Sequence, residues 1–249
     1  MRQTIPMMGM TITIEVVGAR DSKIFDDVFS YFRHVDDVFS TYKETSEITK
    51  INKGLIKENA YSEEIQHIFS QAKKTTIETH GYFSIITNDG VCDPSGIVKG
   101  WAIKNAADMI EKAEYRSFFV DAGGDIEARG TNEEGTPWTV GIRDPFNPEK
   151  NIVKVLYLKN NGVATSGSYS RGAHIYNPHD RTNALDEIIS ITVIGPNVYD
   201  ADRFATAAFA MQRDGIAFIE LLPGFEGYMI DTNGTATMTS GFDRYTTAQ

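Results

Sequence analysis

The chain has 249 residues, of which 41% are hydrophobic, and its formal net charge is −10. A chain of this length can fill a core, and an acidic surface without a cluster of Lys and Arg disfavours nucleic-acid and anionic-membrane binding. The single cysteine, Cys92, can form no internal disulfide, and no segment has the roughly 18 apolar residues of a membrane helix.

The first half of the chain is predicted to begin with a strand, which helices follow. Thr alternates with Ile and Val over residues 9–18, which predicts a strand. Apolar residues at helical spacing then predict helices over residues 21–42, 62–80 and 101–113. Ser22 is a candidate cap of the first of these helices, and Gly81 follows the end of the second.

The second half is richer in β-structure. A buried strand in the stretch 117–130 is stopped by Gly123 and Gly124. Further β-rich segments follow over residues 138–144, 151–159, 162–168 and 188–195. A helix is predicted from residue 200 to about Leu222, and Asn233-Gly234 indicates the turn of a C-terminal hairpin. Because neither a Rossmann glycine fingerprint nor a Walker loop is present, we predict an α+β fold, and we expect residues 1–249 to form a single domain.

Residues 92–102, CDPSGIVKGWA, place small residues and a lysine directly before a predicted helix. A glycine-bearing turn at a helix N-terminus can hold phosphate oxygens through backbone N–H groups, with Lys99 as a nearby positive charge. Such turns also occur as simple connections, in which Asp93 and Lys99 form a surface ion pair. From this stretch alone both interpretations stay open.

The stretch DAGGD, residues 121–125, combines two glycines with a carboxylate. Paired glycines allow a ligand to approach the backbone, and Asp125 can bind a ribose or ribityl hydroxyl. A strand-ending turn that needs positive φ explains the same glycines without a ligand.

Residues 164–178, ATSGSYSRGAHIYNP, place four polar side chains in one segment punctuated by glycines: Thr165, Ser166, Arg171 and His174. His174 can act as a general base near neutral pH, and Arg171 can offset phosphate charge. A solitary histidine is also commonly a packed or surface residue, so this stretch does not decide its own role.

Residues 200–211, DADRFATAAFAM, begin a helix that is otherwise apolar. Asp202 and Thr206 are four residues apart, so their oxygens share one face of the helix. An N-cap role would explain Asp202 but not Thr206. A hard cation such as Mg²⁺ takes oxygen ligands and completes its shell with water or phosphate, so we predict a partial Mg²⁺ site here.

Seven stretches, in this order, resemble the ApbE-like flavin transferases, which are FAD:protein FMN transferases. They are MGMTITI, FSTYKETSEITKIN, GYFSI, DPSGIVKGWA, DAGGDI, ATSGSYSRGAHIYNP and DADRFATAAFAM. The resemblance runs from about Met8 to Gly241. It implies an α+β fold in which two related β-rich units and packed helices surround an FAD site.

The resemblance also implies roles for individual residues. The metal ligands map onto Asp202, Thr206 and the backbone carbonyl of Gly96. The FAD contacts map onto Met8, Tyr42, Tyr82, Phe83, Asp93, Lys99 and His174, with the turn of Gly123, Gly124 and Asp125 alongside. Two positions depart from the family pattern, because Ser84 and Asn177 stand where an Asp is usual.

The implied activity is Mg²⁺-dependent transfer of FMN from FAD to a Thr hydroxyl of an acceptor flavoprotein of the FMN-binding-domain type, with release of AMP. Asp202 then holds the metal that neutralises phosphoryl charge, and His174 is the candidate base or proton shuttle. If water replaces the Thr hydroxyl, the same site is an FAD pyrophosphatase that gives FMN and AMP. A carrier that binds FAD without turnover is a further alternative.

The N-terminus carries no recognisable signal segment, although relatives often have one. We therefore expect a cytoplasmic protein as the sequence stands, or a periplasmic or otherwise extracytoplasmic one if a signal was removed.

Overall fold

The computed structural model of the chain describes residues 1–168, 175–180 and 185–247. Its helices are α1 (Lys23–Phe39), α2 (Glu47–Asn52), α3 (Glu63–Glu78), α4 (Ser95–Lys112), α6 (Val198–Ala210) and α7 (Asp214–Glu220), with short 3-10 turns at Glu58–Ala60 and Phe242–Tyr245. Its strands are β1 (Arg2–Met7), β2 (Met10–Val16), β3 (Phe118–Ala122), β4 (Asp125–Arg129), β5 (Trp138–Arg143), β6 (Ile152–Leu158), β7 (Asn161–Gly167), β8 (Ile188–Gly195), β9 (Glu226–Asp231) and β10 (Ala236–Met238).

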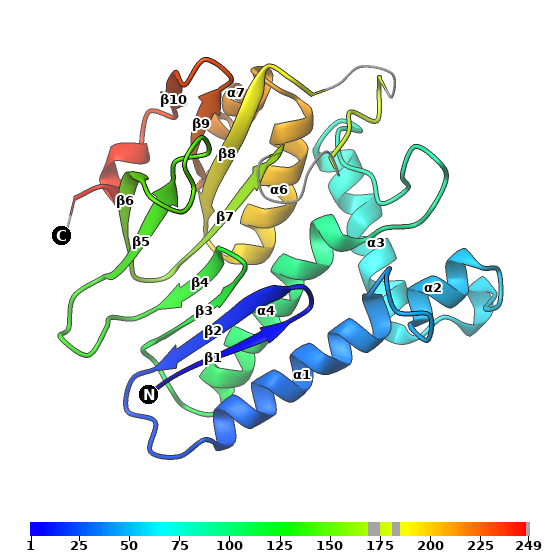
Figure 1. Cartoon of the computed structure of the whole chain (residues 1–249), viewed down its shortest axis with the longest axis horizontal. Helices are drawn as coiled ribbons and strands as arrows, with labels where there is room; N and C mark the ends of the chain where they lie inside the picture. The colour runs from blue at the N-terminus through cyan, green and yellow to red at the C-terminus, as the bar shows by residue number, and fades with distance from the viewer. Residues whose placement is uncertain (169–174, 181–184, 248–249) are drawn as a thin grey trace.

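Eight of these strands form one sheet in the order β1-β2-β3-β4-β7-β8-β9-β10, with antiparallel neighbours throughout. The sheet has an N-terminal half, β1 to β4, and a C-terminal half, β7 to β10, joined where β4 pairs with β7. The α+β prediction is confirmed, and the two β-rich units are the two halves of this one sheet (Figure 1).

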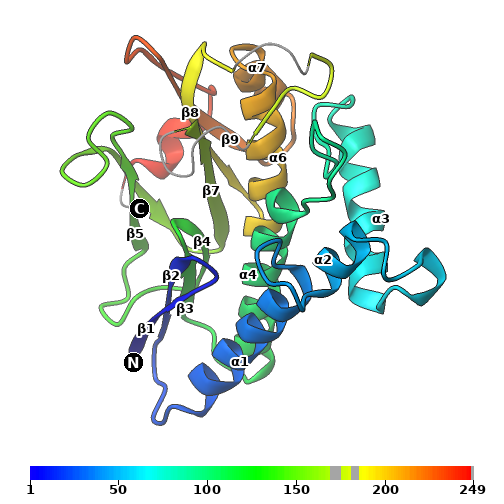
Figure 2. The same ribbon diagram turned by 45° about the vertical axis from the view of Figure 1, so that its right-hand side comes forward.

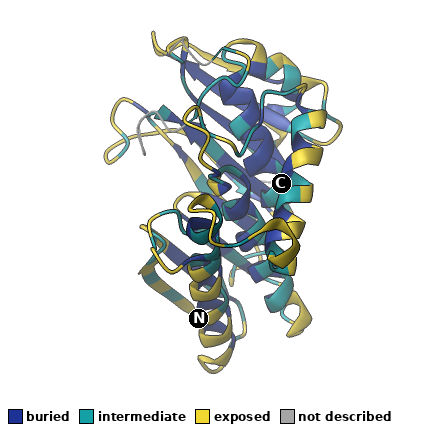
Figure 3. Cartoon of the chain, turned by 90° about the vertical axis from the view of Figure 1, so that its right-hand side faces the viewer, coloured by how far each residue is buried: buried dark blue, intermediate teal, exposed yellow. Residues whose placement is uncertain are grey.

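The helices lie on one face of the sheet, as Figure 2 shows. Apolar residues of α1, α3 and α4 form one core with β2 and β3, and those of α6 and α7 form a second core with β7, β8 and β9. Figure 3 shows these buried residues running through the centre of the molecule. None of the helices described here is long and apolar enough to span a membrane.

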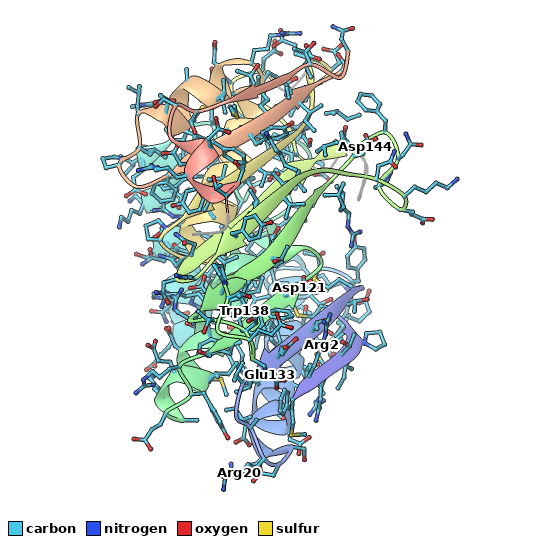
Figure 4. The ribbon with its side chains drawn as sticks, turned by 90° about the vertical axis from the view of Figure 1, so that its left-hand side faces the viewer. Arg2, Arg20, Asp121, Glu133, Trp138 and Asp144 are labelled. Atoms are coloured by element: carbon cyan, nitrogen blue, oxygen red, sulfur yellow. The ribbon has the colours of Figure 1, made fainter. Side chains whose placement is uncertain are left out.

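The hairpin of β5 and β6 covers part of the opposite face of the sheet. Trp138 of β5 packs edge-on against Phe119 of β3, with ring centroids 5.1 Å apart, and a third apolar core forms beneath the hairpin. Beside it lies a cavity of about 480 Å³, the outer cavity, whose lining includes Arg2, Asp121 and Trp138. Figure 4 views the molecule from this side.

Local patterns predicted most of these elements, and long-range packing explains the differences. Residues 2–7 form β1, which was not predicted, by pairing with β2. The helix predicted over 101–113 begins instead at Ser95, so the small residues before it are helical rather than a turn.

The helix predicted from residue 200 to Leu222 is in fact two helices, α6 and α7. Gln212 has φ +55° between them, and its side chain donates a hydrogen bond to the carbonyl of Phe209. A Cβ at Gly215 would lie 2.0 Å from the carbonyl oxygen of Ala208, so α7 can fold back on α6 only with glycine at this position.

Candidate active site

The site lies in a cavity, here called the central cavity, between α4, α6, the turn of β3 and β4, and the end of β7. Ten residues predicted from the sequence line it: Tyr82, Phe83, Asp93, Gly96, Lys99, Gly123, Thr165, Ser166, Asp202 and Thr206. Six further lining residues were not predicted: Ser84, Thr87, Ser95, Gly167, Ile175 and Tyr176. The fold therefore brings together residues that are more than 120 positions apart in the sequence.

Two glycines of α4 allow α6 to approach closely enough to form the cavity wall. A Cβ at Gly100 would lie 2.7 Å from Cβ of Asp202 and 2.9 Å from the carbonyl oxygen of Val198. A Cβ at Gly96 would lie 3.3 Å from Cγ2 of Thr206. The pair Gly96 and Gly100 on α4 thus faces the pair Asp202 and Thr206 on α6, each pair spaced by one helical turn.

The alternative that Asp202 is merely the N-cap of this helix is wrong. Asn197 caps α6, with its side chain accepting a hydrogen bond from the N–H of Asp200, and Asp202 belongs to the second turn. Asp202 is 3% exposed, and its carboxylate accepts a hydrogen bond from the backbone N–H of Gly100, at 2.8 Å. Asp202 therefore joins α6 to α4 at the cavity wall.

A lysine and two buried carboxylates meet at this point. Nζ of Lys99 lies 2.5 Å from Oδ2 of Asp125 and 3.5 Å from Oδ1 of Asp202. Burial raises the pKa of Asp202 above the usual range of an aspartate, while Lys99 opposes the rise and the Asp125 charge adds to it. The other carboxylate oxygen of Asp125, Oδ1, accepts a hydrogen bond from the backbone N–H of Thr165 on β7.

The oxygen atoms here suit a hard divalent cation. Thr206 Oγ1 lies 3.5 Å from the carbonyl oxygen of Gly96, and the Asp202 carboxylate is on the same face of α6 one turn earlier. A carboxylate, a hydroxyl and a carbonyl oxygen form a donor set for Mg²⁺, which usually keeps several waters or phosphate oxygens. In the described part of the chain no group of three or more His, Cys, Asp or Glu residues is placed to hold a metal ion.

A second cavity, the side cavity, adjoins the central one. Its lining includes Met8 and Tyr42, and it shares Asp93, Ser95 and Lys99 with the central cavity. Met8 lies in the tight β1–β2 turn with φ +55°, and Tyr42 is 96% exposed in the loop after α1. The two cavities therefore meet at Asp93, Ser95 and Lys99.

Residues 175–180 hold the loop that contains Tyr82 and Ser84. The His179 and Tyr82 rings pack edge-on with centroids 4.6 Å apart, and His179 Nε2 lies 2.9 Å from the carbonyl oxygen of His80. The Tyr176 hydroxyl donates to the carbonyl oxygen of Ile86. Sequence reasoning missed Tyr176 and His179, because no local pattern indicates that they contact a loop some ninety residues earlier.

Two expected site residues, Asp125 and Gly124, line neither site cavity, and two more, Arg171 and His174, belong to the part of the chain that the structure does not describe. Asp125, expected to bind a ligand hydroxyl, is 2% exposed and lines neither site cavity, because Lys99 covers it. Gly124 lines the outer cavity instead, on the far side of the β3–β4 turn from Gly123. Arg171 and His174 lie outside the residues that the structure describes. Asn177 forms an isolated bridge with Asp180 and accepts a hydrogen bond from the His179 N–H.

Known proteins share this sequence pattern. The pattern of the ApbE family matches residues 8–92 and 88–229 of the chain. The FAD:protein FMN transferase of Escherichia coli is 28% identical over 155 residues, which cover 59% of this chain and 44% of that protein. The one of Haemophilus influenzae is 31% identical over 159 residues, covering 59% of this chain and 46% of that protein. The match thus spans less than half the length of these two relatives. The match with the FAD:protein FMN transferase of Vibrio cholerae, at 23% identity, covers 86% of this chain and 83% of that protein.

Solved structures share the fold. The flavin transferase ApbE from Vibrio cholerae superposes with a TM-score of 0.85 at 22% identity and 98% coverage of both chains. The ApbE protein from Thermotoga maritima gives a TM-score of 0.85 at 20% identity and 99% coverage of both. Because the family pattern spans most of the sequence and the fold agrees over nearly its whole length, this chain belongs to the ApbE family.

Proposed function

We propose that the protein is a Mg²⁺-dependent FAD:protein FMN transferase. The observation that carries the proposal is the oxygen cluster of Asp202, Thr206 and the Gly96 carbonyl, on the wall of a cavity that shares Lys99 with a second, neighbouring cavity. The relatives named FAD:protein FMN transferase support this activity class. FAD is a dinucleotide, and two joined cavities suit a ligand of two halves.

Binding of FAD would use different chemistry in each part of the site. The Lys99 ammonium lies where the two cavities meet, so we place the pyrophosphate there, next to the metal ligands. Tyr82 in the central cavity and Tyr42 beside the side cavity supply aromatic surfaces for planar rings. Bound Mg²⁺ would supply positive charge against the phosphoryl oxygens during transfer.

The transfer step needs an acceptor hydroxyl in line with the phosphorus on the FMN side. A phosphorus–oxygen bond forms to the Thr oxygen of the acceptor, the bond within the pyrophosphate breaks, and AMP leaves. The Thr proton passes to a base, for which His174 is our candidate. Lys99 would offset the negative charge that develops on the departing AMP phosphate.

The decisive experiment supplies or withholds the acceptor. The protein is incubated with FAD and Mg²⁺, with and without an FMN-binding-domain protein from the same organism. AMP is measured by chromatography and covalent flavin by in-gel fluorescence. A transferase releases AMP slowly until the acceptor arrives, because a protein Thr must be steered into line with the phosphorus.

Two other outcomes would contradict the proposal. Rapid AMP release without acceptor, with no covalent flavin when the acceptor is added, would identify an FAD pyrophosphatase. Tight FAD and Mg²⁺ binding without AMP in either reaction, with an acceptor that a known transferase flavinylates, would identify a flavin carrier. Asp202→Asn is the control in each case, since it removes the carboxylate from the proposed metal site.

A further inference from the structure

A buried glutamate that the proposed reaction does not use lies where β4 meets the start of α6. Glu127 is 0% exposed. Its Oε2 accepts a hydrogen bond from the backbone N–H of Val198, at 2.5 Å, and its Oε1 pairs with the Arg129 guanidinium. Val198 is the first residue of α6, so this N–H has no partner within the helix. The carboxylate therefore satisfies a free N–H at the positive end of the helix dipole.

The neighbouring strand β7 also contacts the start of α6. A Cβ at Gly162 of β7 would lie 1.9 Å from the backbone nitrogen of Val198 and 2.1 Å from the carbonyl carbon of Asn197. The backbone of β7 thus touches the start of the helix directly. Glu127 from β4 and Gly162 from β7 together form a socket that receives the N-terminus of α6.

Movement of this socket would move the proposed metal ligands. Asp202 and Thr206 follow Val198 by four and eight residues on the same helix, which corresponds to roughly 6 and 12 Å along its axis. On the opposite side α6 contacts Gly100 with no room for a methyl group. Small displacements of α6 therefore change the spacing between Asp202, Thr206 and the carbonyl of Gly96.

Burying a charged carboxylate at this place costs free energy. Burial raises the pKa of Glu127 to about 7, while Arg129 and the Val198 N–H oppose the rise. An apolar residue would avoid that cost but would leave the Val198 N–H without a partner. The position therefore depends on the hydrogen bond and charge that the glutamate offers to the helix.

We propose that Glu127 is a positioning residue for the metal site: it fixes the N-terminus of α6, and thereby the spacing of the three oxygen ligands. This inference rests on the proposed function, because it concerns the same Mg²⁺ site. Glu127 touches neither cavity and is not expected to contact FAD or the acceptor.

The test compares metal binding with FAD binding in Glu127→Ala, Glu127→Gln and Glu226→Ala. Glu226 is a matched control, because it is a buried glutamate of β9 that accepts from Thr239 and Gly241 and pairs with Arg244, away from α6. Mg²⁺ affinity is measured by calorimetry on protein saturated with FAD without acceptor. FAD affinity is measured by flavin fluorescence without Mg²⁺, and melting temperature by circular dichroism.

We expect Glu127→Ala to weaken Mg²⁺ binding about tenfold, as outer-shell changes do, and to leave FAD affinity within about twofold. Glu127→Gln keeps an acceptor for the Val198 N–H without the charge, so we expect a loss of about threefold. Glu226→Ala should lower the melting temperature while keeping Mg²⁺ affinity close to that of the wild type. A glutamate with a merely structural role would behave like Glu226: its loss would lower the melting temperature and leave Mg²⁺ affinity unchanged.

Unchanged Mg²⁺ affinity in Glu127→Ala, or an equal loss in Glu226→Ala, would overturn the inference. If Glu127→Ala does not fold, the test rests on Glu127→Gln. Wild-type Mg²⁺ affinity in Glu127→Gln would then overturn the inference. A wild-type protein that binds no Mg²⁺ would instead contradict the proposed function, so the two failures can be told apart.

Discussion

At the residue scale, the site is governed by how Lys99 is shared between Asp125 and Asp202. The shorter contact of Lys99 is with Asp125, which is buried behind it, and the longer one is with Asp202 at the cavity wall. Asp125 therefore holds the lysine in place, and Asp202, with the longer contact to Lys99, lines the central cavity. Asp125, which the sequence analysis selected as a ligand contact, supports Lys99 in the folded chain.

Asp202→Asn tests the contribution of the carboxylate at this point. The amide oxygen can still accept from the Gly100 N–H, so we expect the fold to persist, but the negative charge for the metal is lost. Mg²⁺ affinity should fall by at least about 100-fold, the upper end of what an outer-shell change costs. Calorimetry with Mg²⁺ and AMP release in the presence of acceptor measure the effect. Near-wild-type Mg²⁺ affinity would exclude Asp202 as a metal ligand.

At the scale of elements, the site depends on the contact between α4 and α6. The glycines of α4 have low helix propensity, yet both are helical here, because α6 packs directly against them. The same contact directs the Gly100 N–H toward Asp202 and brings Thr206 to the carbonyl of Gly96. Packing of two helices thus creates the set of oxygens that neither helix has alone.

Gly100→Ala and Gly96→Ala form a graded test of this contact. Alanine normally stabilises a helix by up to about 1 kcal/mol relative to glycine. At Gly100 the new methyl group would lie 2.7 Å from Asp202, and overpacking of this kind costs about 1–3 kcal/mol, so we expect a net loss of stability together with weaker Mg²⁺ binding. At Gly96 the closest contact is 3.3 Å, so the loss should be smaller. Urea unfolding measures both, and a Gly100→Ala protein more stable than the wild type would contradict the predicted contact.

At the scale of the whole molecule, the two cavities are built from segments between Met8 in the β1–β2 turn and Thr206 in α6. Both halves of the sheet contribute, since Gly123 follows β3 and Thr165 belongs to β7. A ligand that fills both cavities would therefore bind to the folded chain as a unit and not to one part of it.

FAD should for this reason stabilise the protein more than FMN does. At a free concentration of 100 times its dissociation constant, FAD is expected to raise the free energy of unfolding by about 2.7 kcal/mol. FMN reaches only part of the joined cavities, so at the same concentration its effect should be smaller. Thermal unfolding with FAD, FMN and AMP in parallel gives the comparison. Equal stabilisation by FMN and FAD would argue against a site that holds the whole dinucleotide.

The sequence by itself determined the features that arise within one element. Helical spacing of apolar residues predicted α1 and α3, and Asn233-Gly234 predicted the turn between β9 and β10. The four-residue spacing of Asp202 and Thr206 predicted a shared face on one helix. These features are local because they depend on the period of the helix or the conformational preference of a turn.

Only the tertiary structure decided how those elements meet. It placed the start of α4 at Ser95, divided the predicted last helix into α6 and α7, and buried Asp125 behind Lys99. Local propensity disfavours glycine within α4, and no local signal marks a carboxylate that will lie beneath a lysine from another element. Close packing between residues about one hundred positions apart outweighs those preferences, and such contacts exist only once the whole chain has folded.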